Sequence, residues 1–234
     1  KKNLSDLSAL SVQKILSVLS ALSVQKNTNM IRSLTTILTF TVILGLNAQE
    51  TAPPSVDLRM YDIAKAPDAK RIEADIRKLV SFGTRHTLSD TLSETRGIGA
   101  ARRWIKSEFD RISAACNNCL EVDFQRGLVT KEGNQRLPQD TWIVNVMAIQ
   151  RGAQYPDRYI IMSGDIDSRV SDAMNGTSDS PGANDNASGM AGVLEAARIL
   201  SGYKFSSSII YVGLSGEEQG LFGGKIMADK AKAE

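Results

Sequence analysis

Two stretches in the first half of the chain carry apolar residues at the spacing of an amphipathic helix. In the range 68–82 the apolar positions are Ile72, Ile76, Leu79 and Val80, and Gly83 follows as a stop signal. In the range 96–115 the apolar stripe consists of Ile98, Ala101, Ile105, Phe109 and Ile112. We therefore expect two helices before the first strand. Their charged faces, which include Arg102, Arg103 and Lys106, are expected to be solvated.

Four strands are predicted further along the chain. Residues 120–125 alternate in polarity and residues 142–149 form a second run, so the two are expected to pair as a hairpin with a long loop. Residues 159–162 and 209–212 are short apolar runs, typical of central strands covered on both faces. A helix expected at 187–200 separates these two runs. Strand, helix and strand in this order predict a right-handed crossover within a parallel sheet.

The first 67 residues have a different character. Residues 1–29 contain LSALSVQK at 7–14 and again at 19–26, a low-complexity duplication that suggests translated upstream sequence. Residues 30–48 resemble a secretory signal peptide, with a positive start, an apolar run and small residues before Gln49. Residues 49–67, which contain Pro53, Pro54 and Pro67, are expected to be an extended linker. The protein is therefore expected to be secreted or periplasmic, without a stable membrane anchor after processing.

Charge and cysteine content narrow the function classes. The chain has 234 residues and a net charge of +2, but the first 48 residues hold five of the 28 basic residues and one of the 26 acidic ones. The remainder carries a net charge of −2, so nothing favours nucleic acid as a partner. The two cysteines, Cys116 and Cys119, can form a local disulfide in an oxidising compartment, or remain free thiols.

Carboxylates gather at the predicted ends of neighbouring strands. Asp165 and Asp167 follow the first central strand, Asp185 lies in the loop before the crossover helix, and Glu217 and Glu218 follow the next strand. Ligands of open α/β sheets bind at this carboxyl edge. Because crowded carboxylates disfavour each other's ionisation, divalent cations are the simplest source of counter-charge, and a cation can also activate water. Of the adjacent pair Glu217 and Glu218, one can bind metal while the other acts as general base.

Three ordered motifs carry a family resemblance. They are SGDIDS at 163–168, PGANDNASG at 181–189 and GLSGEEQGLFGG at 213–224. Together they resemble the co-catalytic di-zinc aminopeptidases, peptidase family M28, strongly over residues 159–227. The resemblance implies an α/β, three-layer αβα fold of zinc-exopeptidase type, with a mixed, mainly parallel central sheet. Residues 68–234 would then be the N-terminal portion of a metallopeptidase domain.

The resemblance also implies roles for individual residues. Asp185 would bridge two divalent metal ions, Glu218 would be a terminal ligand, Glu217 the general base, and Asp167 an outer residue that orients the first ligand. Asp165 departs from the family, which usually has His at this position. An Asp there is either a harder ligand, which would favour manganese, magnesium or calcium over zinc, or no ligand.

A second departure concerns ligands that the family draws from later segments. The family takes a further Asp and a His from segments beyond position 234, and His86 is not expected to substitute because it precedes the sheet. We therefore expect a fold that is incomplete at the C-terminus and a chain that is inactive alone.

Three function classes are compatible with these residues. The first is a secreted exopeptidase acting on peptides or proteins with a free N-terminus. The second is a glutaminyl-cyclase-like acyltransferase, and the third is a non-catalytic binding relative. The retained Asp185, Glu217 and Glu218 favour the first over the third, because a binding protein has no need of a general base.

Overall fold

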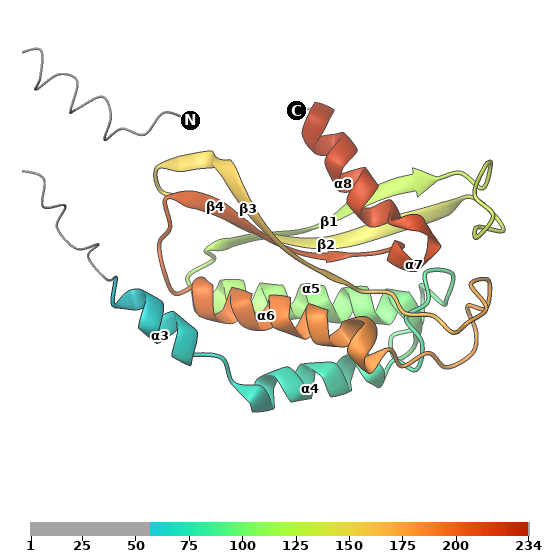
Figure 1. Ribbon diagram of the computed structural model, residues 1–234, viewed down its shortest axis with the longest axis horizontal. Helices are drawn as coiled ribbons and strands as arrows, with labels where there is room; N and C mark the ends of the chain where they lie inside the picture. Colours follow the sequence, from blue (N-terminus) through green and yellow to red (C-terminus); the bar gives the residue numbers. More distant parts are fainter. Residues whose placement is uncertain (1–56, 234) are drawn as a thin grey trace, which may run out of the picture. The chain divides into compact units, whose positions relative to one another are not determined.

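The computed structural model describes residues 57–233, which build a four-stranded sheet between helices (Figure 1). The strands are β1 (Leu120–Val129), β2 (Thr141–Gln150), β3 (Tyr155–Asp165) and β4 (Ser207–Leu214), in the spatial order β1-β2-β4-β3. The pairs β1–β2 and β2–β4 are antiparallel, and β3–β4 is parallel. The hairpin and the crossover unit are therefore confirmed. The sheet is mixed, but within the described residues it is mainly antiparallel and not mainly parallel, because the crossover supplies one parallel pair and the hairpin docks through β2.

Helices cover the sheet on both faces. One layer consists of α4 (Ala69–Val80), α5 (Gly97–Ala115) and α6 (Ser188–Leu200), and α8 (Phe222–Ala233) lies over β1 and β2 on the other face (Figure 1). Asp68 caps α4, since its carboxylate accepts from the backbone N–H groups of Lys70 and Arg71. These elements confirm the predicted helices and the three-layer arrangement. Among residues 57–233 no helix is both long and apolar enough to cross a membrane.

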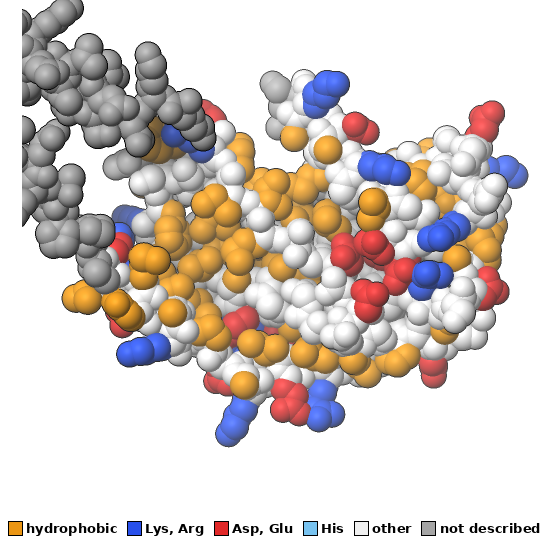
Figure 2. Space-filling view, viewed as in Figure 1, with side chains coloured by type: hydrophobic (Ala, Val, Ile, Leu, Met, Phe, Trp, Pro, Cys, Tyr) orange, Lys and Arg blue, Asp and Glu red, His pale blue; other side chains and the backbone are white. Residues whose placement is uncertain are grey.

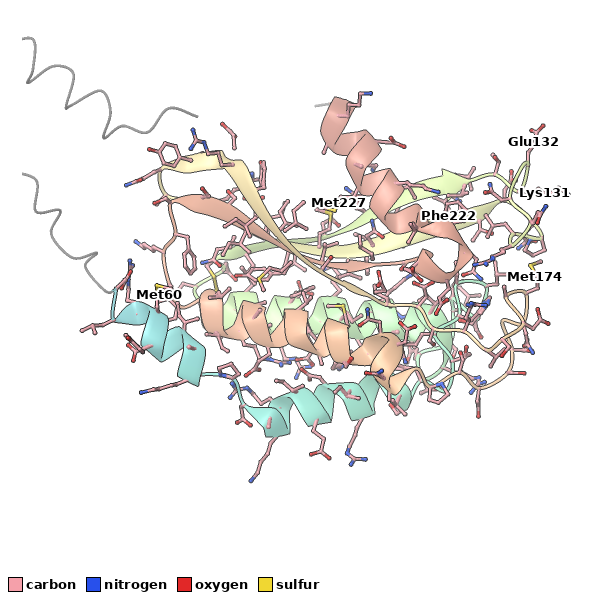
Figure 3. All side chains as sticks on the ribbon, in the orientation of Figure 1. Met60, Lys131, Glu132, Met174, Phe222 and Met227 are labelled. Atoms are coloured by element: carbon pink, nitrogen blue, oxygen red, sulfur yellow. A yellow bond between two sulfur atoms is a disulfide. The ribbon has the colours of Figure 1, made fainter. Side chains whose placement is uncertain are left out.

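The main core lies between the helical layer and the sheet. Its fully buried members include Leu79, Ile105, Phe109, Leu194 and Tyr211. Each contributes about 1.5–3 kcal/mol by leaving water. A smaller cluster of Leu137, Ile143 and Phe222 packs the start of α8 onto the sheet near the site (Figure 3). The two clusters fix the carboxyl ends of β3 and β4 relative to the helices.

Strand β3 does not have the surroundings that its sequence predicts. Ile160 and Ile161 are 58% and 56% exposed, and β3 lies at one edge of the described sheet. The expectation of a strand covered on both faces is correct for β4 and wrong for β3 within residues 57–233. An apolar run shows that a strand can be buried, but it does not show which neighbours flank it.

Two local expectations are also wrong. Helix α3 (Arg59–Lys65) interrupts the range 49–67, which was expected to be extended; the prolines bound this helix without lying inside it. Arg102, expected to be solvated, is 5% exposed. It follows Ile98 by four positions and precedes Ile105 by three, so it lies on the buried stripe of α5. The leader at 1–29, the signal peptide at 30–48 and residues 49–56 lie outside the described residues.

The two cysteines lie at the turn between α5 and β1. The structure joins Cys116 to Cys119 by a disulfide. Cys116 ends α5, and its backbone N–H still donates to the carbonyls of Ile112 and Ser113.

Candidate metal centre

The site is built at the carboxyl ends of the parallel pair β3 and β4. Asp165 is the last residue of β3 and lies opposite Leu214, the last residue of β4. Beyond β4, Gly216 adopts a left-handed conformation (φ 73°) and leads into the short helix α7 (Glu217–Gly220). A side chain at Gly216 would be strained by this φ and would press on Ile143. The backbone therefore turns sharply, and Glu217 and Glu218 follow the strand end directly.

Asp185 reaches the same edge from the loop before α6. It lies in the distorted turn η2 (Ala183–Ala187), where Asp185 and Asn186 have non-helical backbone angles and a cis peptide bond joins them. The amide of Asn186 donates to a carboxylate oxygen of Asp165 at 3.1 Å. The turn thereby ties the loop of Asp185 to the end of β3.

The carboxylate of Asp167 accepts hydrogen bonds from three groups of the protein. It is 1% exposed and accepts from the Thr87 hydroxyl at 2.8 Å and from the backbone N–H groups of Glu217 and Glu218, both at 3.2 Å. A carboxylate at the first N–H groups of a helix satisfies donors that have no partner inside the helix. Asp167 therefore positions the backbone of the Glu217–Glu218 turn. The role that the resemblance implied, orienting a metal ligand, stays a prediction.

The segment from Thr84 to Thr87 supports the site, although sequence reasoning placed it before the sheet and away from the chemistry. Besides Thr87, the buried Arg85 donates to the carbonyls of Ile166, Pro181 and Gly182, which lie in the loops of Asp165 and Asp185. Nothing in the local sequence at 84–87 indicates this role. The contacts span more than 80 residues in sequence, so periodicity does not reveal them.

His86 lies beneath α7 but is engaged elsewhere. It is fully buried; its Nδ1 accepts from the backbone N–H of Leu88, and its Nε2 lies 3.1 Å from the carbonyl of Ala173. Gln219 of α7 donates to the same carbonyl at 2.9 Å. Both ring nitrogens are therefore engaged, and His86 is not free to bind a metal ion in this arrangement.

The carboxylates of the site act on one another electrostatically. Burial raises the pKa of Asp165, and the neighbouring charges of Asp185 and Glu218 raise it further, against the hydrogen bond from Asn186. Burial likewise raises the pKa of Glu217, with added repulsion from Glu218, Asp165, Asp167 and Asp185. Figure 2 shows acidic side chains gathered on this face beside α7. The five carboxylates therefore lie near enough to affect one another's pKa values, at the edge of the sheet where the sequence placed them. They are those of Asp165, Asp167, Asp185, Glu217 and Glu218.

The buried Arg85 acts on Asp167 and Asp185 through its charge, and two further arginines approach Glu218. Arg169 donates through Nε to Glu218 at 2.5 Å, and Arg136 donates to the backbone carbonyl of Glu218. A cavity of about 60 Å³ lies against Asp165 and Glu217, walled on its other sides by residues of β4, α7 and α8. Glu217 thus faces a small space beside a second carboxylate.

Comparison with known proteins agrees with this geometry. Residues 145–234 match the model of peptidase family M28. Over 183 residues the chain is 44% identical to a probable zinc metalloprotease of Pyrenophora teres f. teres, a match that covers 78% of this chain and 38% of the relative. The chain belongs to peptidase family M28. It spans between 36% and 41% of the length of this and two further fungal relatives of the same description.

Solved structures place the M28 chain in a known fold. The LapA aminopeptidase of Legionella pneumophila superposes with a TM-score of 0.59 at 18% identity, over 77% of this chain and 43% of that one. A glutaminyl cyclase of Fimbriiglobus ruber superposes with a TM-score of 0.53 at 23% identity, over 71% and 57%. At these identities the likeness concerns the fold alone, which both kinds of enzyme share.

The carboxylate oxygens at the M28 site are ligands of the kind that divalent cations prefer. Asp165, Asp185, Glu217 and Glu218 offer hard oxygen ligands. The raised pKa values of Asp165 and Glu217 reflect burial first and repulsion second, and a bound cation would favour the ionised form against both. Within residues 57–233, however, no three or more His, Cys, Asp or Glu side chains are arranged closely enough to hold an ion as they stand. Glu218 is instead turned onto Arg169. In this arrangement the Glu218 carboxylate is occupied by an ion pair and is not free to bind a cation.

Proposed function

We propose that the protein is a secreted metal-dependent exopeptidase that removes residues from peptides or proteins with a free N-terminus. One observation carries the proposal: Asp165, Asp185, Glu217 and Glu218 converge at the carboxyl end of β3 and β4 with Arg169 as their one side-chain ion-pair partner in the described part of the chain. Membership of peptidase family M28 supports peptide-bond hydrolysis as the reaction.

We assign the metal-binding role to Asp165, Asp185 and Glu218. Asp185 acts electrostatically on both Asp165 and Glu217, which supports its role as the carboxylate shared by two divalent ions. Zinc is the preferred ion because the fungal relatives are described as probable zinc metalloproteases. Asp165 in place of a softer ligand favours harder ions such as manganese more than a histidine would.

Glu217 is the general base of the proposed reaction. A bound divalent cation lowers the pKa of water and polarises the peptide carbonyl. Glu217 accepts the proton of the attacking water at its carboxylate and then donates it to the nitrogen of the leaving amine. Its pKa, raised by burial and by the four neighbouring carboxylates, suits both steps. Asp167 keeps Glu217 in place by holding its backbone N–H.

Export is supported by the disulfide as well as by the leader sequence. Disulfides persist mainly in oxidising compartments, and the bond between Cys116 and Cys119 joins the only two cysteines of the chain. A secreted or periplasmic location follows as part of the proposal.

An assay with leucine 4-nitroanilide and its N-acetylated form tests the proposed reaction. The zinc-loaded full-length protein should release nitroaniline from the free amine and not from the acetylated compound. Cyclisation of a glutaminyl peptide without hydrolysis would instead identify an acyltransferase. If neither reaction occurs in the metal-loaded protein, the exopeptidase proposal is wrong and a binding role remains.

The variant Asp165→His tests whether position 165 binds metal. If Asp165 binds metal, the histidine should raise zinc affinity relative to manganese affinity in calorimetric titrations, because imidazole is the softer donor. Unchanged zinc stoichiometry and affinity would show that position 165 is not a ligand.

A further inference from the structure

A second cavity, which shares no lining residue with the cavity at the carboxylates, lies between the first half of α5 and the strands β1 and β2. It has a volume of about 460 Å³. Three arginines line it, Arg102 and Arg103 from α5 and Arg126 from β1, together with the rings of Phe124 and Trp142. The described residues that line it include no Asp or Glu. The cavity therefore has a positive wall and an aromatic wall.

Arg102 is the buried charge of this cavity. It is 5% exposed and donates through Nε to the Ser215 hydroxyl at 3.3 Å, while its Nη2 is buried without a hydrogen-bond partner among the described residues. Burial lowers the pKa of Arg102 to about 10; the charge of Arg126 acts in the same direction and that of Asp167 against it. A buried guanidinium with an unused donor is costly, because its hydration is not replaced. An anion in the cavity would offset this buried charge.

The other two arginines differ in whether their guanidinium N–H groups are free to bind a ligand. Arg103 donates to the backbone carbonyls of Thr91, Leu92 and Ser93, so its guanidinium holds the wall of the cavity. Arg126 is exposed, lies over the ring of Phe124 at 5.6 Å, and forms no ion pair within residues 57–233. Arg102 and Arg126 are thus the two guanidinium groups available to a ligand.

The aromatic wall indicates what the anion carries. Trp142 is 59% exposed, an unusual position for an indole ring, and it lies on β2 beside the half-buried Val144. Guanidinium groups bind carboxylates through paired N–H donors, and aromatic rings add apolar contact. We propose that this cavity binds a carboxylate attached to an aromatic or bulky apolar group. The carboxylate pairs with Arg102 and Arg126, and the apolar part lies against Phe124 and Trp142.

Two sources offer this chemistry, a free aromatic acid and the C-terminal residue of a peptide. Fluorescence of Trp142 can report on both. The chain has one other tryptophan, Trp104, so a Trp104→Phe background isolates the signal. The probes are phenylacetate, acetyl-Gly-Phe with a free C-terminus, the amides of both, and inorganic phosphate. A chelator is present throughout, so the outcome is independent of metal at the carboxylate site and of the exopeptidase proposal.

We expect saturable binding of phenylacetate or acetyl-Gly-Phe, no binding of the amides, and weaker binding at high salt because the attraction is between charges. The probe with the higher affinity identifies the source. Arg126→Gln, at an exposed position that folding tolerates, should weaken binding roughly tenfold or more. Arg158→Gln is the matched control, since Arg158 is also exposed and lies over an aromatic ring, that of Tyr155, on β3.

Several results would overturn the proposal. They are the absence of saturable binding by either carboxylate, equal binding of the amides, tighter binding of phosphate than of phenylacetate, and unchanged affinity in Arg126→Gln.

Discussion

The molecule contains two concentrations of acidic side chains, and they are neutralised in different ways. Between α4, α5 and α6, the carboxylates of Asp75, Glu108 and Glu195 surround Arg198, which lies 2.5, 3.1 and 3.6 Å from them. Arg71 adds a second partner to Glu195. Within the described residues, the four carboxylates at the carboxyl end of β3 and β4 have one ion pair, between Glu218 and Arg169, while the buried Arg85 acts on Asp185 through its charge. The first group joins three helices, and the second has fewer ion pairs per carboxylate.

The pKa directions express the same contrast. Burial raises the pKa of Glu195, but hydrogen bonds from Arg71 and from the backbone of Asp68, with the charges of Arg71 and Arg198, bring it below its ordinary value. Burial and like charges leave the pKa values of Asp165 and Glu217 above theirs. Carboxylates that stabilise the fold carry their counter-charge within the chain. Those of the site require counter-charge from a ligand, and four predictions follow from this difference.

The largest effect is expected for Glu217→Gln. Removing the general base should lower kcat about 10²–10⁴-fold, with zinc affinity retained, because Glu217 is assigned to proton transfer and not to metal binding. Steady-state assays and metal titration measure the two quantities. Glu132→Gln, in the exposed turn between β1 and β2, is the control. Activity close to that of the parent protein would remove Glu217 from the mechanism.

Arg198→Met should destabilise the fold by about 3–5 kcal/mol, because it leaves three largely buried carboxylates without their shared partner. Urea unfolding of the metal-free protein measures the change. Arg77→Met removes the exposed pair with Glu73 and should cost less than about 1 kcal/mol. Equal losses in the two variants would contradict the structural role given to the helix network.

Asp167→Asn should lower zinc affinity about 10–100-fold, because residues that orient a site contribute on this scale. The amide can accept from Thr87 but cannot satisfy the N–H groups of Glu217 and Glu218 as a carboxylate does. Calorimetric titration measures the loss, and Asp157→Asn, exposed on β3, is the control. Unaltered affinity would show that the position of the Glu217–Glu218 turn does not depend on Asp167.

The smallest expected effect is a change in the free energy of unfolding, which should have opposite signs for a carboxylate of the site, Asp165, and one of the helix network, Glu195. In metal-free protein Asp165→Asn should raise the free energy of unfolding by roughly 0.5 kcal/mol, a value reduced for solvent screening at a half-buried side chain. Glu195→Gln should lower it, since Arg71 and Arg198 lose a partner. Denaturant titrations of both variants provide the test. Destabilisation by Asp165→Asn would mean that the site is not under repulsion.

The sign of the pH dependence follows from the raised pKa of Asp165. The folded protein keeps the Asp165 proton at pH values where the unfolded chain has lost it. Stability from this group is therefore full below the ordinary Asp pKa and is lost as the pH rises through the raised value. Asp165→Asn should remove this part of the pH dependence in metal-free protein.

Local patterns in the sequence predicted most elements and the convergence of the carboxylates. The stripes of α4 and α5 and the apolar run of β4 are set by burial against one core, which periodicity reports directly. Asp165, Asp185 and Glu217 were found because parallel strands end at one edge. The number of residues between a strand end and each carboxylate can be counted in the sequence, so no knowledge of long-range contacts was needed to place them.

Long-range contacts account for what the sequence did not reveal. Thr87 and Arg85 support the site from a segment before the first strand, and no local pattern distinguishes them. The burial of Arg102 depends on its hydroxyl partner Ser215, 113 residues away. The exposure of β3 depends on which strands flank it.

Zinc titration of the metal-free chain, followed by both calorimetry and chemical unfolding, tests most directly that the carboxylates of the site bind cations. We predict saturable binding and, at a free zinc concentration about 100-fold above Kd, stabilisation by about 2.7 kcal/mol, with both effects lost in Asp185→Asn. If zinc neither binds nor stabilises the chain, or acts equally on Asp185→Asn, the account of this site is wrong.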